Sequence, residues 1–451
     1  MTIAEAAARL RARQVSAVEL ARESLRRIRE LQPILNAFIT VTEDLAMQQA
    51  GIADEELARG IDRGPLHGIP YALKDLFVTR GIRTTAGSKI FAGYVPDYDC
   101  AAFEKLTEAG AVLMGKTGMH ELAYGITNDN PHFGPVRNPH DPTRISGGSS
   151  GGSGAAVAAE MVFFALGTDT GGSIRIPAAY CGCVGLKPTF GRVSRFGVLP
   201  LAFSLDHVGP LARTVRDAAI VMNAIAGFDP RDDSSSRRPV PDYLPSANYS
   251  LRGRRIGIPD NFFTERLAPS VESSYRSVLR RAESLGAVLV PTRLPDPAGI
   301  NSIGRMILLS EASALMHPYL HRRSDFGADV LALLDQGSLI SATDYINAQR
   351  LRKIYQKRWG RCLNDIDVIL MPTTAIYPPL IGQEKVQLGE VEEDVRLAST
   401  RFVRPFNVSG LPAISVPFVD SALPFGLQII GSPFAEAILL STATALLLPG
   451  E

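Results

Sequence analysis

The spacing of apolar residues changes along the chain, and the change separates a helical start from the rest. Over residues 2–60 the apolar positions recur at helical spacing. Two Ser/Thr-x-x-Glu capping boxes begin at Thr2 and Ser16. We expect the second helix to end before Pro33 and a third to begin near Glu43. The first 60 residues are therefore predicted to be an N-terminal helical segment that packs on the core.

From Gly68 onward, short apolar runs lie between turns and alternate with helical patterns, such as those over 101–109 and 270–285. This alternation predicts an α/β protein with a largely buried sheet. The polar, proline-rich stretch 229–241 is interpreted as a surface excursion, because the alternation resumes after it. The predicted strands cover residues 69–73, 111–114, 161–166, 255–258, 288–291 and 368–371.

Composition narrows the class of protein. The 451 residues are 45% hydrophobic and 21% charged, with a net charge of +1 and no basic stripe, so we expect no nucleic-acid partner. There is no run of 18 apolar residues and no signal-peptide pattern, which indicates a cytoplasmic protein with no membrane contact. Four cysteines and seven scattered histidines offer neither a disulfide framework nor a metal site. We expect no metal and no cofactor.

Three segments carry residues suited to catalysis. Lys74 ends an apolar strand, and a buried lysine loses its charge more readily, which makes it a competent base near neutral pH. Residues 146–154 hold four serines among glycines and lead into an Ala/Val helix. A third strand delivers the chain to the turn 169–173, which ends in Ser173 and whose consecutive N–H groups can point at one oxyanion.

Together these segments resemble the amidase signature family. The resemblance rests on GIPYALKD, GGSSGGSGAAVAA, DTGGSIRIPAAYCGCVGLKPTFGRVSRFG, FNVSGLPAISVP and FGLQIIG. It covers about 15–215 and 366–440, with little likeness over 220–365. The family's fold implies one large mixed-sheet α/β domain covered by helices, here residues 61–451, in which 220–365 is a variable segment of the substrate pocket.

The resemblance also assigns site residues. It implies a Ser–cis-Ser–Lys triad with Ser173 as nucleophile, Ser149 as proton relay after a cis peptide bond, and Lys74 as base. The family often has Asn where Gly118 stands, so we expect Gly118 and Met119 to line the substrate pocket. The implied oxyanion hole consists of the backbone N–H groups of Thr170, Gly171, Gly172 and Ser173, with support from Ser150, Asp169 and Arg175.

The expected activity is therefore hydrolysis of a carboxylic amide through an acyl-enzyme, with aryl amides or carbamates, as in a urethanase, as further substrates. The weak likeness of the middle segment favours a stand-alone amidase, which acts on small molecules, over the A subunit of a glutamine-dependent tRNA amidotransferase. The family adds a homodimer as a further partner.

Two interpretations from other classes stay open. Gly147–Gly151 also fits G-x-S-x-G, the nucleophile elbow of an α/β-hydrolase esterase, but a loop rather than a strand precedes it. A catalytically silent binding protein on the same fold is the other, although all three triad positions are filled.

Overall fold

A mixed β-sheet runs through the molecule and positions every other element. The computed structural model describes residues 1–246, 249–418 and 423–447. Within them the sheet has eleven strands, and a separate hairpin pairs β10 (Lys385–Leu388) with β11 (Val391–Asp394). From edge to edge the sheet holds β1 (Phe38–Val41), β3 (Val112–Thr117), β2 (Pro70–Lys74), β4 (Phe164–Asp169), β6 (His207–Ala212), β5 (Val184–Lys187), β12 (Ala413–Phe418), β13 (Phe425–Ile430), β9 (Val368–Pro372), β7 (Arg255–Pro259) and β8 (Val288–Thr292).

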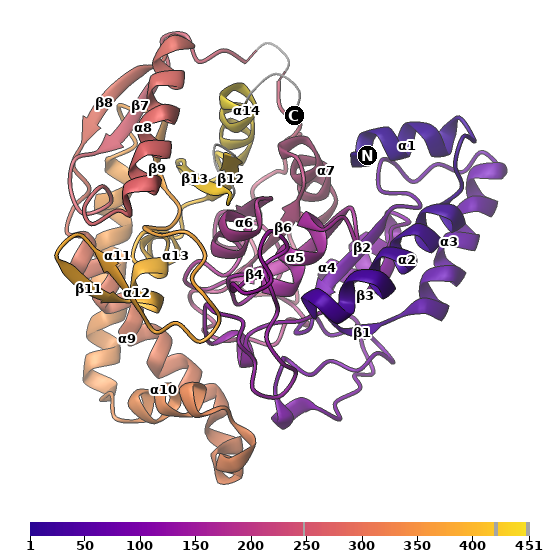
Figure 1. Ribbon diagram of the computed structural model, residues 1–451, viewed down its shortest axis with the longest axis horizontal. Helices are drawn as coiled ribbons and strands as arrows, with labels where there is room; N and C mark the ends of the chain where they lie inside the picture. Colours follow the sequence, from indigo (N-terminus) through magenta and orange to yellow (C-terminus); the bar gives the residue numbers. More distant parts are fainter. Residues whose placement is uncertain (247–248, 419–422, 448–451) are drawn as a thin grey trace.

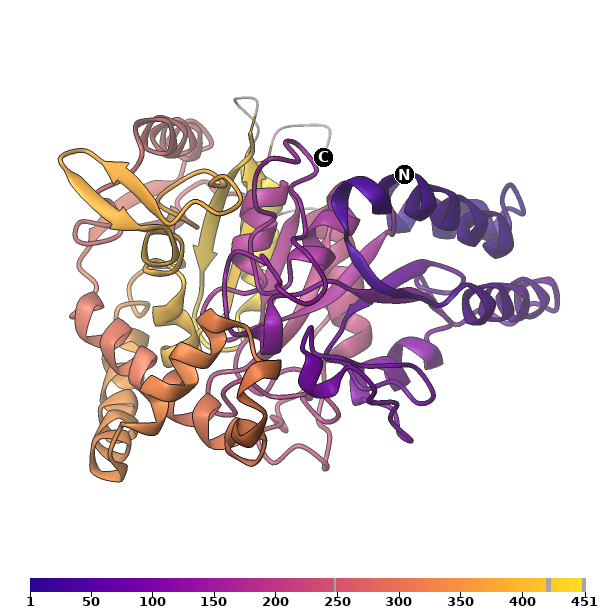
Figure 2. The same ribbon diagram turned by 60° about the horizontal axis from the view of Figure 1, so that its bottom comes forward.

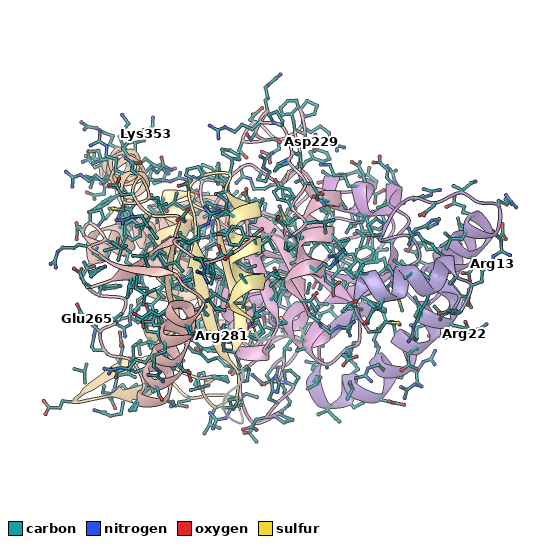
Figure 3. The ribbon with its side chains drawn as sticks, turned by 90° about the horizontal axis from the view of Figure 1, so that it is seen from above. Arg13, Arg22, Asp229, Glu265, Arg281 and Lys353 are labelled. Atoms are coloured by element: carbon teal, nitrogen blue, oxygen red, sulfur yellow. The ribbon has the colours of Figure 1, made fainter. Side chains whose placement is uncertain are left out.

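Helices cover this sheet, and two groups of them lie at its opposite ends (Figures 1 and 2). In Figure 3, Arg13 and Arg22 lie at the N-terminal end and Glu265 at the other. The helices are α1 (Ile3–Arg11), α2 (Ala17–Leu35), α3 (Glu43–Ala58), α4 (Ala101–Glu108), α5 (Gly151–Ala158), α6 (Arg175–Cys181), α7 (Val215–Ile225), α8 (Pro269–Ser284), α9 (Pro297–Met316), α10 (Ala328–Ser338), α11 (Ala342–Arg361), α12 (Val395–Thr400), α13 (Arg404–Ser409) and α14 (Glu436–Leu446), with short 3₁₀ turns at Lys89–Phe91, Glu121–Ala123 and His317–Asp325.

The fold confirms the predicted class and all six predicted strands. Both capping boxes form, at Thr2 and at Ser16. Two expectations about the N-terminal segment are wrong. Helix α2 continues past Pro33 to Leu35, because a proline in the last turn removes only one hydrogen bond near a helix end that Asn36 then closes in the left-handed conformation. Moreover, the segment is not wholly helical, since β1 joins the sheet edge by pairing with β3.

The sheet places two candidate residues at the same end of two neighbouring strands. Strands β2 and β4 run parallel, with Leu73 opposite Leu166, so Lys74 and Asp169 both lie at carboxyl ends of neighbouring strands. Ligands of α/β sheets bind outside such strand ends. Helices α5 and α6 follow the two serine-bearing segments and pack against each other and the sheet.

Close backbone contact fixes the start of α5. A Cβ atom on Gly152 would lie 2.5 Å from both the backbone N and O of Gly118 and from the carbonyl oxygen of Ala37, none of which can move without shifting the chain. The glycine therefore lets the segment after Ser149 approach the backbone of Gly118, which directly follows β3.

Replacing Gly152 with alanine should destabilise the protein by about 1–3 kcal/mol through this overpacking, although alanine is the better helix former. The measurement is chemical denaturation of the purified protein. Gly51→Ala in α3 is the matched control, because nothing lies within 4 Å of its Cβ position; it should stabilise by about 0.5–1 kcal/mol. Equal stability of the two variants would contradict overpacking at Gly152.

Candidate active site

Lys74 is fully buried at the end of β2, between β3 and β4. Its Nζ lies 2.8 Å from Ser149 Oγ and 2.8 Å from Thr168 Oγ1. Burial lowers the pKa of Lys74 to about 7, against the opposing effect of the charges on Asp206 and Asp169. A large fraction of Lys74 is therefore a neutral amine at physiological pH, next to a serine hydroxyl that it can deprotonate.

Ser149 stands in the loop before α5, and the Gly148–Ser149 peptide bond is cis, as the family resemblance implies. The next residue ties this loop to the nucleophile segment, since the Ser150 N–H donates to the Ser173 carbonyl at 3.2 Å. Ser150 Oγ also donates to the Thr168 carbonyl at 3.1 Å and accepts from the Thr168 N–H at 3.3 Å. The two serine segments and the Lys74 partner Thr168 are therefore held together.

The turn that carries Ser173 is built around the carboxylate of Asp169. This carboxylate accepts from the N–H groups of Gly172 at 2.8 Å and Ile174 at 3.1 Å. The Arg175 guanidinium donates to both oxygens, at 3.0 and 2.9 Å. Burial raises the pKa of Asp169, but Arg175 outweighs it and holds the pKa well below its usual range. Both side chains are buried, and their complete pairing makes that burial tolerable.

Three N–H groups of this turn remain available to an oxyanion. Those of Thr170, Gly171 and Ser173 have no hydrogen-bond partner in the part of the chain that the structure describes. The inclusion of Gly172 among the donors conflicts with the structure, because its N–H is committed to Asp169. The reason is that the buried Asp169 carboxylate, around which the loop folds, takes this N–H at 2.8 Å.

No hydrogen bond joins the hydroxyls of Ser149 and Ser173 within the described residues. Ser173 is 5% exposed, whereas Ser149 is fully buried. Of the two serines, Ser149 is the one that contacts the buried lysine, and Ser173 is the one that retains some exposure. Their roles in a triad stay a prediction at this point.

Gly118 and Met119 are both buried. A Cβ on Gly118 would lie 2.7 Å from Val136 Cγ2, and its N–H donates to the Ala37 carbonyl at 2.8 Å. The Met119 carbonyl accepts from Asn130 Nδ2 at 2.9 Å. Close packing explains the missing side chain at 118, and the assignment of these residues to the substrate pocket stays a prediction.

Sequence reasoning missed several polar residues of the site. Asn407 Nδ2 donates to the Asp169 carboxylate at 2.8 Å, and Arg175 donates to the side-chain oxygens of Asn407 and Gln428 at 2.7 and 2.6 Å. The signal was available, because Asn407 and Gln428 carry side-chain amides inside the mainly apolar motifs FNVSGLP and FGLQIIG. Asp206 is a further missed residue; it accepts from Thr170 Oγ1 at 2.6 Å, and burial raises its pKa to about 6.

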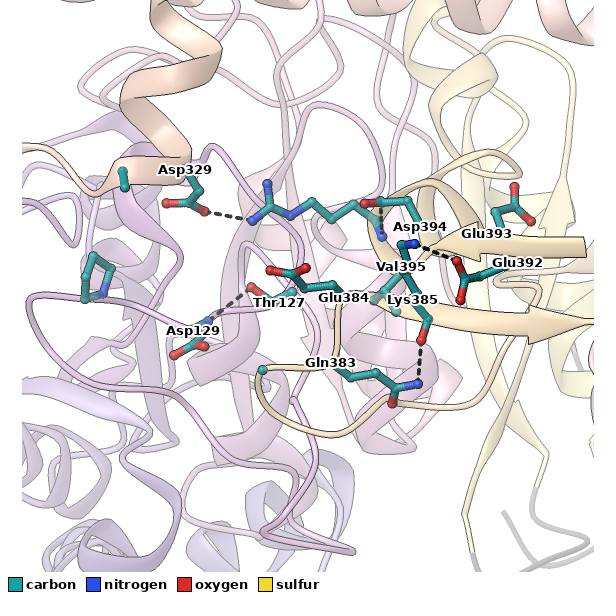
Figure 4. A pocket seen from close by; sticks show the side chains of 14 residues that line it. Thr127, Asp129, Asp329, Gln383, Glu384, Lys385, Glu392, Glu393, Asp394 and Val395 are labelled. Atoms are coloured by element: carbon teal, nitrogen blue, oxygen red, sulfur yellow. Dashed lines mark hydrogen bonds and ion pairs between the residues drawn. The ribbon is translucent and has the colours of Figure 1, made fainter.

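A surface groove of about 720 Å³ lies elsewhere, between residues 127–131, the start of α10 and the β10–β11 hairpin (Figure 4). Its walls carry ion pairs such as Asp329 with Arg396 at 3.2 Å and Lys385 with Glu392 at 2.6 Å. No candidate catalytic residue lines it. Among the described residues, no three His, Cys, Asp or Glu side chains gather to hold a metal ion, and no helix there has the length and apolarity to cross a membrane.

Comparison with known proteins shows to which family this chain belongs. The family model described as Amidase matches residues 19–440. The chain belongs to the amidase signature family. It is therefore an enzyme of that family, an amide hydrolase or an amidotransferase. Membership of this family takes the place of the two earlier alternatives, an α/β-hydrolase esterase and a catalytically silent binding protein.

The similar proteins are of more than one kind. The A subunit of the glutamyl-tRNA(Gln) amidotransferase of Carboxydothermus hydrogenoformans is 40% identical over 97% of this chain and 94% of its own. The solved structure of the same kind of subunit from Thermotoga maritima has a TM-score of 0.82 at 35% identity, covering 99% and 94% of the two chains. A vestigial protein complex said to reveal the origins of an s-triazine catabolic enzyme has a TM-score of 0.95 at 35% identity, covering 99% and 98%.

These relatives correct two predictions. The choice of a stand-alone amidase is wrong, since relatives aligned over nearly the whole chain are amidotransferase A subunits. Residues 220–365 do not support that choice, because an alignment over 97% of the chain must include most of that segment. The expectation of small-molecule partners alone and no nucleic acid is also wrong, because the name of these relatives specifies a tRNA and one component of a larger enzyme.

Amide hydrolysis should depend on pH through Lys74. Only the neutral amine accepts a proton, and its fraction rises with pH, so the rate should rise to a plateau with a midpoint near pH 7. The measurement is the rate at which an active-serine reagent labels the protein at different pH values. A range of roughly pH 5–9 covers the titration of such a base.

Lys74→Met should slow labelling by about 10²–10⁴-fold and remove the pH dependence. Lys89→Met is the control, because Lys89 is exposed, and it should retain the profile. A midpoint unchanged in Lys74→Met would show that another group is the base.

Proposed function

We propose that this chain is the A-type subunit of a glutamine-dependent amidotransferase, which hydrolyses the side-chain amide of glutamine and supplies ammonia for transfer to glutamyl-tRNA. The observation that carries the proposal is the 40–41% identity to such subunits over 97–98% of the chain. The geometry around Lys74 supports the proposal, because a buried amine with a lowered pKa, a serine hydroxyl bonded to it and free backbone N–H groups near Ser173 are the groups that this reaction needs.

The reaction would begin at the buried amine. Neutral Lys74 accepts the proton of Ser149, to which it is already hydrogen-bonded. Ser149 in turn accepts the proton of Ser173, whose oxygen attacks the amide carbon of glutamine. The two hydroxyls come into hydrogen-bond contact at this step, since catalytic contacts often tighten only when substrate is bound.

The tetrahedral intermediate carries a negative oxygen, and the free N–H groups of Thr170, Gly171 and Ser173 are the available donors. The relay then returns the proton to the leaving nitrogen, so ammonia departs and a glutamyl ester remains on Ser173. Water attacks this ester with the same base, and glutamate leaves. Asp169 and Arg175 hold the turn in shape throughout, which makes them positioning residues.

Ammonia released in this way must be passed to an acceptor before it is protonated and lost to solvent. A glutaminase subunit therefore needs partner subunits that bind the acceptor, which in this proposal is a tRNA that carries glutamate. The relatives, which are named as one subunit of a larger enzyme, agree with this requirement.

The proposal predicts that the chain, mixed with B and C subunits and glutamyl-tRNA, converts glutamine to glutamate and yields amidated tRNA. Ser173→Ala should lower the glutaminase rate by about 10⁴-fold or more, because the nucleophile of such a relay cannot be replaced. Glutamate and ammonia are measured together with the aminoacyl group of the tRNA.

Ser302→Ala is the matched control, since Ser302 is an exposed serine of α9 that bonds only to the Ala298 carbonyl at 2.9 Å, and it should keep full activity. Absence of glutamine hydrolysis in the complete mixture would refute the proposal. So would full glutaminase activity of Ser173→Ala.

A further inference from the structure

One cationic side chain beside the nucleophile turn has no anionic partner. Arg404, at the start of α13, donates from Nη2 to Thr400 Oγ1 at 3.1 Å, whereas its buried Nε has no hydrogen-bond partner. No carboxylate lies within 4.0 Å of its guanidinium in the described residues. The side chain is only partly accessible, and burial lowers the pKa of Arg404 to about 10, so it stays charged at neutral pH.

The contrast with Arg175 shows what is missing. Arg175 is fully buried and is paired with Asp169 at 2.9 Å. A guanidinium removed from water without such a partner costs free energy, which an anion bound at the same place would recover. No anion offsets this cost at Arg404 among the described residues. Arg305 on α9 adds a second positive charge nearby, which lowers the pKa of Arg404 further.

The position of Arg404 connects it to the reacting centre. A Cβ on Gly171 would lie 3.6 Å from Arg404 Nε, and Gly171 carries one of the free N–H groups. The preceding residue, Val403, accepts from Arg175 Nη1 at 3.0 Å. On its other side, Arg404 packs against α9, where a Cβ on Gly304 would lie 3.3 Å from its Cδ. The frame that shapes the oxyanion turn therefore also holds Arg404 in place.

A second unpartnered donor lies close by. Tyr124 is only 5% exposed, and its buried hydroxyl has no hydrogen-bond partner among the described residues. Burial raises the pKa of Tyr124, and the charges of Arg305 and Arg404 act against this rise, so both guanidinium groups lie within electrostatic range of the phenol. A neutral phenol that donates and a guanidinium that donates form a natural pair for one carboxylate.

We propose that Arg404 and Tyr124 bind a carboxylate on the acyl side of the substrate, so that the enzyme selects amides whose acyl chain ends in a carboxylate. The inference rests on the proposed function for the identity of that substrate, in which the group is the α-carboxylate of glutamine. The Gly171 turn and the Arg404 guanidinium are adjacent, with Arg404 Nε 3.6 Å from the Cβ position of Gly171. A carboxylate held by Arg404 would therefore lie near the amide that reacts at the turn.

The experiment compares matched amides with and without the carboxylate. One pair is glutamine and 4-aminobutanamide, and the other is glutaramate and butanamide. Wild-type enzyme, in the complete complex, should prefer the carboxylate member of each pair. Arg404→Met should lower kcat/KM for the carboxylate member by about 10–100-fold, mainly through KM, and change the neutral member less than about twofold.

Further variants separate binding from structure. Arg404→Lys should restore part of the preference, because it keeps the charge but not the forked geometry. Tyr124→Phe should lower the preference by about 10-fold, and it provides the same comparison if Arg404→Met does not fold. Arg280→Met, an exposed arginine of α8, should leave both substrate pairs unchanged.

The outcomes distinguish this inference from the proposed function. If glutamine is not hydrolysed but glutaramate is preferred over butanamide through Arg404, the proposed function fails and the carboxylate site stands. If glutamine is hydrolysed and Arg404→Met slows both members of a pair equally, or neither, Arg404 has only a structural role and the inference is overturned.

Discussion

The burial of one amine is the constraint on which this site depends. Lys74 lies at the end of a strand with neighbours on both sides, so water cannot solvate its charge. Its immediate partners are hydroxyls, Ser149 and Thr168, while the carboxylates of Asp206 and Asp169 act only from further away. A direct carboxylate partner would keep the amine protonated and useless as a base. Burial without such a partner holds the pKa of Lys74 at about 7, and a proton can then move from serine to lysine.

A network of buried polar side chains holds the nucleophile segment in place beside that base. The Asp169–Arg175 pair orders the Ser173 turn and draws in Asn407 and Gln428 from segments more than 200 residues away, by sequence separations of 238 and 253. This explains why the C-terminal motifs accompany the serine motifs although they contribute no nucleophile. The same network fixes the backbone before Arg404, so the acyl-side cation and the oxyanion donors share one support.

Local patterns predicted most of the fold. Capping boxes, apolar runs and glycine-serine turns act within a few residues, and the strands and helix starts that they predict are present. Strand β1 was missed because four residues show no periodicity, and the end of α2 was misplaced because proline is tolerated in a last turn. The hydrogen bond from the Gly172 N–H to Asp169 and the lack of an anionic partner for Arg404 among the described residues depend on how the chain packs in three dimensions, which local sequence patterns do not show. The preference for a stand-alone amidase failed for another reason: weak motif likeness in residues 220–365 was taken for a difference in function.

The most direct test of the account is the protonation state of Lys74 itself. Proteins labelled with ε-¹³C lysine can be titrated by NMR, and the Lys74 resonance is identified by its loss in Lys74→Met. The account predicts that this resonance titrates near pH 7. A Lys74 resonance that titrates near the ordinary lysine value of about 10.4 would contradict it, because the amine would then be charged when the enzyme acts.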